Sequence, residues 1–223
     1  MSVHQFLARI SARIRHMMLR LTPRSRRFHR IYRHRFWGGK NLESASGAGS
    51  TLDATNQVRT MLPATLDKID CRVLLDLGCG DFNWMKEVPL LCQYIGADIV
   101  DELIEKNQKQ YANESRRFIV LDATRDNLPN SVDTILCREV FFHLSHRDIK
   151  AALRRIKQSN ARYLIATNIS HLEENIDTFT GGFRLIDLRQ APFNLPEPVE
   201  VIPDHGVANN RYLCVWDVAD FRC

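Results

Sequence analysis

The sequence predicts an α/β fold, with a doubly wound, mostly parallel sheet of seven strands that ends in an antiparallel hairpin, and with a basic helical extension at the N-terminus. Two observations lead to this prediction. From Cys71 onward, short apolar runs typical of buried strands alternate with segments of helical periodicity. The first apolar run starts at Val73, continues into Asp76 and ends in a turn with Gly78 and Gly80. Because such a turn lets backbone N–H groups come close to a ligand, it predicts a nucleotide-type cofactor site.

The extent of each element follows from its hydrophobic pattern. We expect strands at residues 72–76, 93–98, 117–121, 132–137 and 161–167, and helices at residues 53–62, 83–88, 100–110 and 146–157. The runs at residues 199–202 and 212–216 predict the terminal hairpin. Pro63 is expected to end the helix before it, because proline has no backbone N–H to donate. The segment from Ser44 to Ser50 is rich in serine and glycine, which indicates a flexible connection or a lid.

The first 40 residues carry a strong positive charge. They hold ten arginines and Lys40 but no acidic residue, so this segment has a charge of +11 and the remainder −6 within the overall +5. Within residues 3–21, arginines separate apolar side chains that recur at helical spacing, namely Phe6, Leu7, Ile10, Ile14, Met17, Met18 and Leu21. We therefore divide the chain into a basic leader, residues 1–40, with an amphipathic helix at residues 3–21, and a domain at residues 41–223.

Three kinds of partner suit this leader, in the following order of preference. Its apolar stripe would pack on the domain or on a second subunit. A basic amphipathic helix also suits peripheral association with an anionic membrane surface. Clustered arginines suit nucleic acid, which is the least favoured of the three.

The composition excludes several classes of protein. No apolar run is long enough to span a membrane, and no apolar core of a signal peptide precedes a cleavage site. The six cysteines include no C-x-x-C pair, which argues against structural zinc and favours a reduced protein. We therefore expect a cytoplasmic protein without a bound metal, held at most peripherally at a membrane.

The spacing of acidic residues indicates the kind of cofactor. A second apolar run ends at Asp98, eighteen residues after Gly80, where α/β nucleotide folds place a carboxylate for ribose hydroxyls. Asn83 replaces the third glycine of a dinucleotide fingerprint, and Asp81 at the helix entrance would repel phosphates. Together with Asp76, these acids suit a ligand that has an amino group and no phosphate.

In these residues the chain resembles the class I S-adenosylmethionine-dependent methyltransferases, a Rossmann-like family. Their first motif reads apolar-apolar-Asp-apolar-Gly-x-Gly, and the resemblance spans roughly residues 70–170. The segments at residues 37–39, 44–52 and 81–85 are similar to a bacterial subfamily that is loosely associated with polysaccharide gene clusters. The resemblance implies S-adenosylmethionine as cofactor and a small-molecule or glycan-like acceptor.

The resemblance also implies roles for individual residues. Gly78 and Gly80 would let the backbone reach the methionine part of the cofactor, and Asp76 and Asp81 would receive its ammonium group. Asp98 would accept hydrogen bonds from both ribose hydroxyls. The residues expected to bind the cofactor are Asp76, Gly78, Gly80, Asp81, Asp98, Ile99, Asp122, Ala123 and Cys137.

The segment after the fourth expected strand, which runs from Cys137 to Val140, supplies the catalytic candidates. It departs from the Asn/Asp-Pro-Pro-aromatic signature that serves planar amino groups, and this leaves hydroxyl or carboxylate acceptors. Since an alcohol has a high pKa, a general base is useful, and Glu139 and His143 are equal candidates for it. His143 would equally suit helix packing, and Arg138 would bind an anionic substrate or pair with Glu139.

Loops around the expected site supply candidates for substrate contacts and for a lid. Ligands bind beyond the carboxyl ends of the strands in open α/β sheets, so the residues that follow these ends are favoured. Trp84 would either shield the cofactor or pack at the start of its helix. The substrate and lid candidates are Trp37, Ser46, Gly47, Gly49, Ser50, Trp84, Asn168, His171 and Arg184.

The function that these residues indicate is methyl transfer from S-adenosylmethionine, by in-line displacement, to an oxygen of a small or glycan-like acceptor. Two alternatives stay open. The basic arm would suit an RNA methyltransferase, whose affinity for RNA falls steeply with added salt. The chain would otherwise be a non-catalytic adaptor of the same fold at a membrane surface, although the intact Asp76, Gly78, Gly80 and Asp98 argue against this.

Overall fold

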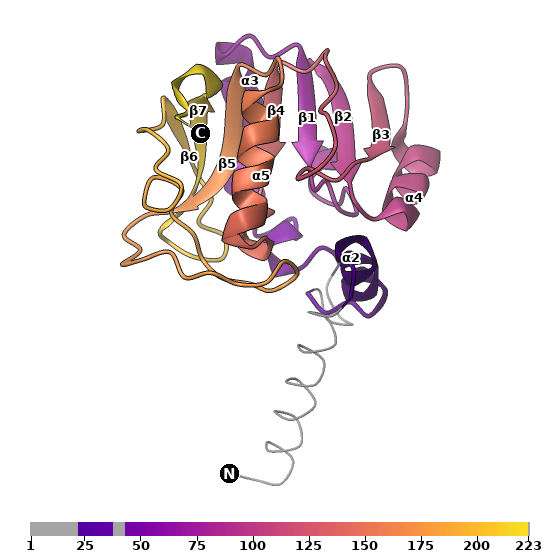
Figure 1. Ribbon diagram of the computed structural model, residues 1–223. Helices are drawn as coiled ribbons and strands as arrows, with labels where there is room; N and C mark the ends of the chain where they lie inside the picture. Colours follow the sequence, from indigo (N-terminus) through magenta and orange to yellow (C-terminus); the bar gives the residue numbers. More distant parts are fainter. Residues whose placement is uncertain (1–21, 38–42, 223) are drawn as a thin grey trace, which may run out of the picture.

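The computed structural model describes residues 22–37 and 43–222. Its centre is a seven-stranded sheet in the order β3-β2-β1-β4-β5-β7-β6 (Figure 1). Neighbouring strands from β3 to β5 run parallel, and β7 is antiparallel to both β5 and β6. The strands are β1 (Val73–Leu77), β2 (Gln93–Asp98), β3 (Arg116–Val120), β4 (Thr134–Cys137), β5 (Tyr163–Ile169), β6 (Glu200–Pro203) and β7 (Arg211–Asp217). This confirms the predicted sheet and its antiparallel C-terminal hairpin.

Helices cover both faces of the sheet. α3 (Asn56–Lys68) and α4 (Asp101–Tyr111) bury side chains in one core cluster, and α5 (His146–Lys157) buries its apolar face in the other. In Figure 1, α5 crosses the near face of the sheet. The other short elements are α2 (Arg24–Arg33) and the 3-10 turns η1 (Ala48–Ser50), η2 (Met85–Glu87), η3 (Phe141–His143) and η4 (Val218–Asp220). Coverage on both faces explains why the central strands have nearly continuous apolar sequences.

α5 shows how the sequence sets the ends of an element. Ser145 Oγ accepts a hydrogen bond from the backbone N–H of Asp148 and caps the first turn. Three basic side chains, Arg154, Arg155 and Lys157, lie in the last turn, where they suit the negative end of the helix dipole. The buried face consists of Ile149, Ala152, Leu153 and Ile156. The predicted bounds of this helix are confirmed.

Two predicted helices differ from the structure. The helix expected to end before Pro63 continues to Lys68, with Pro63 inside it. Its second half buries Leu62 and Leu66, and this burial offsets the backbone hydrogen bond that a proline cannot make. The helix expected at residues 83–88 is only the short turn η2, and several strand ends differ from the prediction by one or two residues.

The described part of the basic leader is packed against the domain. α2 adds Phe28 and Ile31 to the main core, where they are 8% and 1% exposed. Full burial of such a side chain stabilises by roughly 1.5–3 kcal/mol, so α2 is held firmly on the domain. The division of the chain at residue 40 stays a prediction, and the amphipathic helix expected at residues 3–21 lies outside the described residues.

Within residues 22–37 and 43–222, no helix has the length and apolar character needed to cross a membrane. The same ranges contain no group of three or more His, Cys, Asp or Glu side chains arranged to hold a metal ion. The described cysteines are free thiols, namely Cys71, Cys79, Cys92, Cys137 and Cys214.

Candidate functional site

A pocket opens at the carboxyl ends of β1 to β4, where open α/β sheets bind ligands. It contains about 790 Å³ of empty space, part of it open to solvent. Its lining residues are Arg24, Phe28, Tyr32, Trp37, Ser46, Ser50, Leu77, Gly78, Asp98, Ile99, Leu121, Asp122, Ala123, Thr124, Arg138, Glu139, Val140, His143 and Leu144.

Asp98, at the end of β2, is the most deeply set acid of this pocket, at 7% exposure. Two backbone groups fix its carboxylate: Gly80 N donates to Oδ2 at 3.2 Å, and Val100 N donates to Oδ1 at 3.0 Å. Burial raises the pKa of Asp98 to about 6, although these two hydrogen bonds oppose the shift. Each oxygen keeps a further lone pair, so the carboxylate can still accept hydrogen bonds from the hydroxyls of a ligand.

The turn after β1 brings the backbone to the pocket. Gly78 lines it with a φ of +75°, and a Cβ at this position would overlap Val140 Cγ2. The N–H of Gly78 donates to the Ala97 carbonyl at 2.7 Å, which fixes the turn on β2. Gly80 has a φ of +58°, but a Cβ there would overlap the hydroxyl of Ser46. Gly80 therefore makes room for a neighbouring loop, and only Gly78 faces the pocket.

The residues after β3 form another wall. Asp122 and Ala123 line the pocket, and Asp122 Oδ1 accepts hydrogen bonds from Thr124 N at 3.0 Å and Thr124 Oγ1 at 2.7 Å. Arg24 of α2 donates to the same Thr124 hydroxyl and lies 3.4 Å from Asp122 Oδ1. Arg24, a residue of the basic leader, thus contacts Asp122, which the sequence assigns to cofactor binding.

α2 and the residues after it close one side of the pocket. The Trp37 ring lies 5.9 Å from the Phe28 ring and 5.6 Å from the Tyr32 ring, measured between centroids. The Tyr32 hydroxyl lies 3.1 Å from Ser46 Oγ, which ties the helix to the loop before α3. Burial raises the pKa of Tyr32, so this hydroxyl keeps its proton. Trp37 was expected here from the sequence, whereas Phe28 and Tyr32 were not.

The serine- and glycine-rich loop before α3 is held in place rather than flexible. Both carboxylate oxygens of Asp81 accept hydrogen bonds from it: Ala45 N donates at 2.6 Å, and the hydroxyls of Ser44 and Ser46 donate at 3.0 Å each. Ser46 and Ser50 line the pocket, as a lid or wall would require. Asp81 therefore positions this loop, and its expected contact with the cofactor's ammonium group is corrected.

Two glycines let this loop lie against its neighbours. Gly47 has a φ of +115°, and a Cβ there would lie 3.4 Å from Trp37 Cβ. Gly49 abuts Glu139, whose carboxylate a Cβ would overlap, and its carbonyl accepts a hydrogen bond from Arg138 Nη1 at 2.7 Å. Neither glycine is among the lining residues, so both shape the loop rather than contact a ligand.

Replacing Asp81 with asparagine is expected to lower the free energy of unfolding by about 1–3 kcal/mol, because an amide leaves some of the loop donors unpaired. Urea denaturation measures this change. Asp67→Asn is the matched control, since Asp67 is an exposed acid of α3, and it should change the same quantity by less than about 0.5 kcal/mol. Equal effects of the two substitutions would show that Asp81 does not hold the loop.

Four charged side chains join the end of β4 to β6 and β7: Arg138, Asp204 and Arg211 are buried, and Glu139 is partly buried. Asp204, which is fully buried, accepts hydrogen bonds from Arg138 Nε at 3.0 Å and Nη2 at 2.9 Å, and from Arg211 Nη2 at 3.0 Å. Arg211 Nη1 in turn donates to Glu139 Oε1. Arg138 is thus engaged with Asp204 and with the Gly49 carbonyl. The expected direct pair of Arg138 with Glu139 is corrected, whereas Arg138 lines the pocket and its binding of an anionic substrate stays a prediction.

Glu139 lines the pocket in an uncommon backbone conformation. Its φ is +61°, which costs a non-glycine residue on the order of 1–3 kcal/mol. Its N–H donates to Thr167 Oγ1 at 2.8 Å, and its carboxylate pairs with Arg211. These contacts hold the carboxylate at the pocket in spite of the backbone cost, and such strain clusters at active sites and ligand-binding sites.

His143, at the end of η3, offers a nitrogen to the pocket. Its Nδ1 lies 2.8 Å from the Gly182 carbonyl, and since a carbonyl only accepts, Nδ1 carries the proton and Nε2 keeps its lone pair. The ring stacks on Trp37 at 4.1 Å between centroids, and the Phe183 ring lies 5.6 Å away. Burial lowers the pKa of His143, so the ring is neutral at neutral pH and Nε2 can accept a proton.

Comparison with known proteins identifies the fold. Residues 74–161 match a family model described as a methyltransferase domain. The mitomycin 7-O-methyltransferase MmcR has a TM-score of 0.58 and 17% identity, over 78% of this chain and 55% of that one. The chain has the class I methyltransferase fold. Human N-acetylserotonin methyltransferase, solved with S-adenosylmethionine, has a TM-score of 0.56 and 13% identity, over 73% of this chain and 52% of that one.

The chain spans about half the length of these two methyltransferases. At such low identities the likeness concerns the fold alone. No curated protein matches the chain significantly in sequence.

S-adenosylmethionine is the cofactor that the methyltransferase match indicates, and the pocket fits it, which confirms the prediction. Gly78 lacks the Cβ that would obstruct close approach of a ligand to the backbone, and Asp98 presents a carboxylate to the ligand's hydroxyl groups. Ile99 and Ala123 add apolar surface suited to an adenine ring. When bound, the cofactor supplies a methyl group that is activated by a sulfonium.

Three predicted site residues lie inside the methyltransferase fold rather than at the pocket. Asp76 points away from the pocket, because successive strand residues alternate between faces, and its Oδ2 accepts a hydrogen bond from the Tyr94 hydroxyl at 2.6 Å. Burial raises the pKa of Asp76 to about 7. Cys137 is 1% exposed within β4, and Trp84 packs in the core with the Arg138 guanidinium 5.3 Å from its ring. The expected cofactor roles of Asp76 and Cys137 are corrected, and Trp84 takes the packing role that the sequence also allowed rather than a substrate contact.

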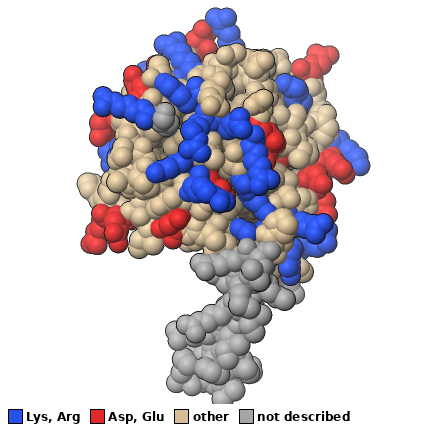
Figure 2. Space-filling model, in the orientation of Figure 1, with Lys and Arg blue, Asp and Glu red and all other residues tan. Residues whose placement is uncertain are grey.

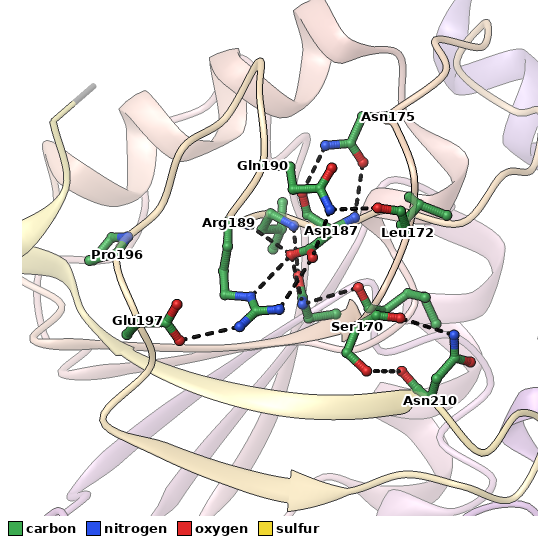
Figure 3. Close-up of polar contacts among 12 residues, drawn as sticks. Ser170, Leu172, Asn175, Asp187, Arg189, Gln190, Pro196, Glu197 and Asn210 are labelled. Carbon is green, nitrogen blue, oxygen red and sulfur yellow. Dashed lines mark hydrogen bonds and ion pairs between the residues drawn. The ribbon is translucent and has the colours of Figure 1, made fainter.

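Asn168 was expected near the substrate but ties β5 to the segment that follows it. Its Nδ2 donates to Asp187 Oδ1 at 3.0 Å, and its Oδ1 accepts a hydrogen bond from Leu188 N at 2.6 Å. Asp187 is 1% exposed and is also bound by Arg189, while its N–H donates to Asn175 Oδ1 at 2.9 Å. Figure 3 shows Asn175 and Arg189 converging on Asp187. Asn168 is therefore a structural residue that fixes the long connection between β5 and β6.

Arg184 supports the turn that carries His143. Its Nη1 and Nη2 donate to the carbonyls of Phe141 and Leu144, and burial lowers the pKa of its guanidinium to about 10. His171 is exposed after β5, with a φ of +58°, and does not line the pocket. The expected substrate contacts of both residues are corrected, and Arg184 becomes a positioning residue.

Sequence reasoning missed several residues of the site. The α2 residues were missed because the amphipathic pattern was ended at residue 21, although apolar side chains recur at residues 28, 31 and 32. The charged residues at the end of β6 and the start of β7 were missed because the sequence alone does not distinguish a buried ion pair from surface charges. The missed residues are Arg24, Phe28, Tyr32, Thr124, Asp204 and Arg211.

Proposed function

We propose that the protein is an S-adenosylmethionine-dependent methyltransferase that methylates a hydroxyl group of a small or glycan-like acceptor. The observation that carries this proposal is that one pocket contains both the fixed carboxylate of Asp98 and a neutral His143 whose Nε2 keeps its lone pair. The carboxylate would accept hydrogen bonds from the two ribose hydroxyls of the cofactor, and the imidazole would accept the proton of the acceptor hydroxyl.

Each residue has a role that its geometry supports. The backbone at Gly78 and the carboxylate of Asp98 bind and orient the cofactor, while α2 and the loop before α3 exclude water from it. Nε2 of His143 takes the proton of the acceptor hydroxyl as the oxygen receives the methyl group. Glu139, which Arg211 holds in place, orients the acceptor by accepting a hydrogen bond from it.

The choice of an oxygen acceptor rests on the segment after β4. This segment has no Asn/Asp-Pro-Pro-aromatic signature, and the turn that follows it carries His143, whose imidazole would serve as the base that an alcohol needs. A glycan-like acceptor is supported by Ser46, Ser50 and Glu139, which bring hydroxyl and carboxylate groups to the pocket beside the Trp37 ring. MmcR, one of the structures of similar fold, is described as an O-methyltransferase.

Titration calorimetry with S-adenosylmethionine tests the cofactor side of the proposal. The affinity is expected to be about tenfold weaker at about pH 5 than at about pH 7.5, because the pKa of Asp98 is raised to about 6 and ligand hydroxyls bind the ionised carboxylate. The Asp98→Asn variant should bind more weakly at both pH values and lose this dependence. Glu105→Gln, at an exposed position of α4, should behave as the unchanged protein.

The outcomes separate the candidate functions. No binding of S-adenosylmethionine would overturn the proposal. A pH dependence that persists in Asp98→Asn would assign the titration to another buried group, such as Asp76. Formation of S-adenosylhomocysteine only with amine or RNA acceptors, in a panel that also contains sugars, polyols and phenols, would overturn the choice of oxygen in a small or glycan-like acceptor.

A further inference from the structure

Two cysteines lie at the amino ends of β1 and β2, at the edge of the sheet opposite to the pocket. Cys71 stands two residues before Val73, the first residue of β1, and Cys92 comes directly before Gln93, the first residue of β2. β1 and β2 are neighbouring strands in which Val73 is paired with Gln93. The two cysteines are therefore one residue out of register across adjacent strands.

Hydrogen bonds fix the backbone around both cysteines. Cys71 N donates to the Leu66 carbonyl at 2.9 Å at the end of α3, and Gln93 N donates to the Arg72 carbonyl at 2.8 Å. A stagger of one residue between adjacent strands corresponds to a Cα–Cα distance of about 6 Å. This lies within the roughly 4.4–6.8 Å that disulfides bridge, so the backbone already has the separation that a bond between Cys71 and Cys92 needs.

The two thiols lie on the same face of the sheet. The backbone bends at Arg72, so Cys71 does not continue the alternation of side chains along β1. Both cysteines pack against the core cluster that contains Leu74 and Tyr94. Their side chains are hydrogen-bonded to each other, and both are free thiols. The sulfur atoms of the pair therefore already face one another.

A hollow at the surface leads to this pair. Both half-buried cysteines line it, and it contains about 410 Å³ of empty space, part of it open to solvent. Three other cysteines of the described residues do not line the hollow: Cys79, Cys137 and Cys214 are 7%, 1% and 4% exposed. A small reagent can therefore reach Cys71 and Cys92, while core packing shields these three.

Charges of both signs surround the pair. Asp70 and Arg72, on either side of Cys71, form an exposed ion pair at 3.0 Å. Figure 2 shows Lys and Arg intermixed with Asp and Glu at the top of the view, where β1 and β2 begin in Figure 1. A charged reagent is therefore neither strongly attracted nor strongly repelled at this end of the molecule.

Cys92 is the better nucleophile of the two. The hydrogen bond from Cys71 lowers the pKa of Cys92, and backbone hydrogen bonds at Cys92 and Leu74 add to this effect, against burial and the carboxylate of Asp133. The same thiol–thiol hydrogen bond, together with burial, raises the pKa of Cys71. Because the thiolate is the form that attacks a disulfide, Cys92 should react first.

We propose that Cys71 and Cys92 are a modification site, at which a low-molecular-weight disulfide such as oxidised glutathione forms a reversible disulfide bond. The Cys92 thiolate attacks one sulfur of the reagent, which gives a mixed disulfide and releases one thiolate. Cys71 then loses its proton to water, and its thiolate attacks Cys92 Sγ and releases the second thiolate. Two protein thiols lose two electrons in total, and one molecule of the reagent is reduced to two thiols.

This thiol pair is separate from the pocket. β1 and β2 lead away from it to Gly78 and Asp98, which line the pocket at the other ends of the two strands. The disulfide therefore joins the two strands without covering the pocket. Since it also constrains the unfolded chain, it should raise the midpoint of thermal unfolding by roughly 5–10 °C, and reduction should reverse this shift.

Peptide mapping of the full chain tests the proposal. The native protein is incubated with oxidised glutathione, treated with iodoacetamide and digested with trypsin without reduction. Trypsin cleaves after lysine and arginine, so Cys71 falls in the peptide of residues 69–72 and Cys92 in that of residues 87–106. Mass spectrometry is expected to find these two peptides joined, and dithiothreitol should separate them.

Single variants distinguish the two chemical steps. Cys71→Ser should stop at a glutathione adduct on Cys92, whereas Cys92→Ser should react at Cys71 at least about tenfold more slowly, because burial raises the pKa of that thiol. Neither variant should be stabilised by oxidised glutathione in thermal unfolding. Cys214→Ala, at a buried cysteine of β7, is the matched control and should form the joined peptides as fast as the unchanged protein.

Three results would overturn the proposal. The first is that the joined peptides form only after the chain is unfolded in urea. The second is that Cys71 or Cys92 of the native chain is joined to a different cysteine. The third is equally fast modification of Cys71→Ser and Cys92→Ser, which would contradict the assignment of Cys92 as the attacking thiol. Because the assay contains neither S-adenosylmethionine nor an acceptor, its result does not depend on the proposed methyl transfer.

Discussion

Replacing Asp204 with asparagine is expected to lower the free energy of unfolding by about 3–5 kcal/mol. The carboxylate is fully buried and accepts hydrogen bonds from both Arg138 and Arg211, whose side chains are each 3% exposed. An amide in its place leaves two cations out of water with only Glu139 to balance them. Urea denaturation followed by circular dichroism measures the change.

A control and a double variant make this expectation specific. Asp70→Asn breaks the exposed pair of Asp70 with Arg72, whose side chains are 77% and 78% exposed, and should cost less than about 1 kcal/mol. Adding Arg211→Gln to Asp204→Asn removes one of the uncompensated cations. The double variant should therefore lose less stability than the sum of the two single variants. An Asp204→Asn variant as stable as Asp70→Asn would contradict the account of a buried charge network.

The network also explains a link between stability and the site. Arg138 binds the Gly49 carbonyl, and Arg211 binds the carboxylate of Glu139, so both arginines hold parts of the pocket wall. A buried ion pair contributes little to stability in comparison with apolar packing. The main effect of these ion pairs is therefore positional: they place Glu139 and the loop before α3, which apolar contacts alone would not define.

The parts of the site that follow strand ends could be predicted from the sequence. Asp98, Ile99, Asp122 and Ala123 lie at or shortly after the ends of β2 and β3, and parallel strands bring such residues to the same edge of the sheet. The order of apolar runs therefore fixes their place without any knowledge of tertiary contacts. Gly78 could be predicted for the same reason. It is the first residue after β1, where a glycine allows the chain to turn at the end of the strand.

The parts that depend on partners far along the chain could not be predicted. Asp81 and Asn168 have the residue types of ligand-binding groups, yet their partners are Ser44 and Ser46 in one case and Asp187 in the other. A polar side chain near a strand end satisfies either a ligand or another segment of the protein. Which of the two it binds depends on how loops pack, and local sequence carries no signal of that.

The role of the leader illustrates the same limit. Its charge suggested a membrane or nucleic-acid partner as alternatives to packing, and in the structure Phe28 and Ile31 bury α2 in the core while Arg24 and Tyr32 reach the pocket. Because charged residues dominate the composition of this segment, its sequence carried little indication that Phe28 and Ile31 are buried or that Arg24 and Tyr32 line the pocket. The apolar spacing within α2 was a signal for packing, and the charge count was a signal for a partner.

Replacing His143 with glutamine is expected to lower kcat by about 10²–10⁴-fold while leaving the affinity for S-adenosylmethionine unchanged. Its Nδ1 is bound to the Gly182 carbonyl, so only Nε2 is able to take the acceptor's proton. Because burial lowers the pKa of His143 below its ordinary value, kcat should be level at neutral pH and should fall only in acid, as the ring becomes protonated. The variant should lose this acid limb.

The measurement must separate His143 from the other titrating group of the pocket. At saturating cofactor, protonation of Asp98 affects binding rather than kcat, so a limb in kcat reports the base. His171→Asn is the control, since His171 is exposed, has a positive φ that asparagine tolerates and does not line the pocket. If Glu139→Gln lowered kcat and removed the limb while His143→Gln did neither, Glu139 would be the base. Because Arg211 already binds one oxygen of Glu139, we expect Glu139→Gln to raise KM for the acceptor and to change kcat much less.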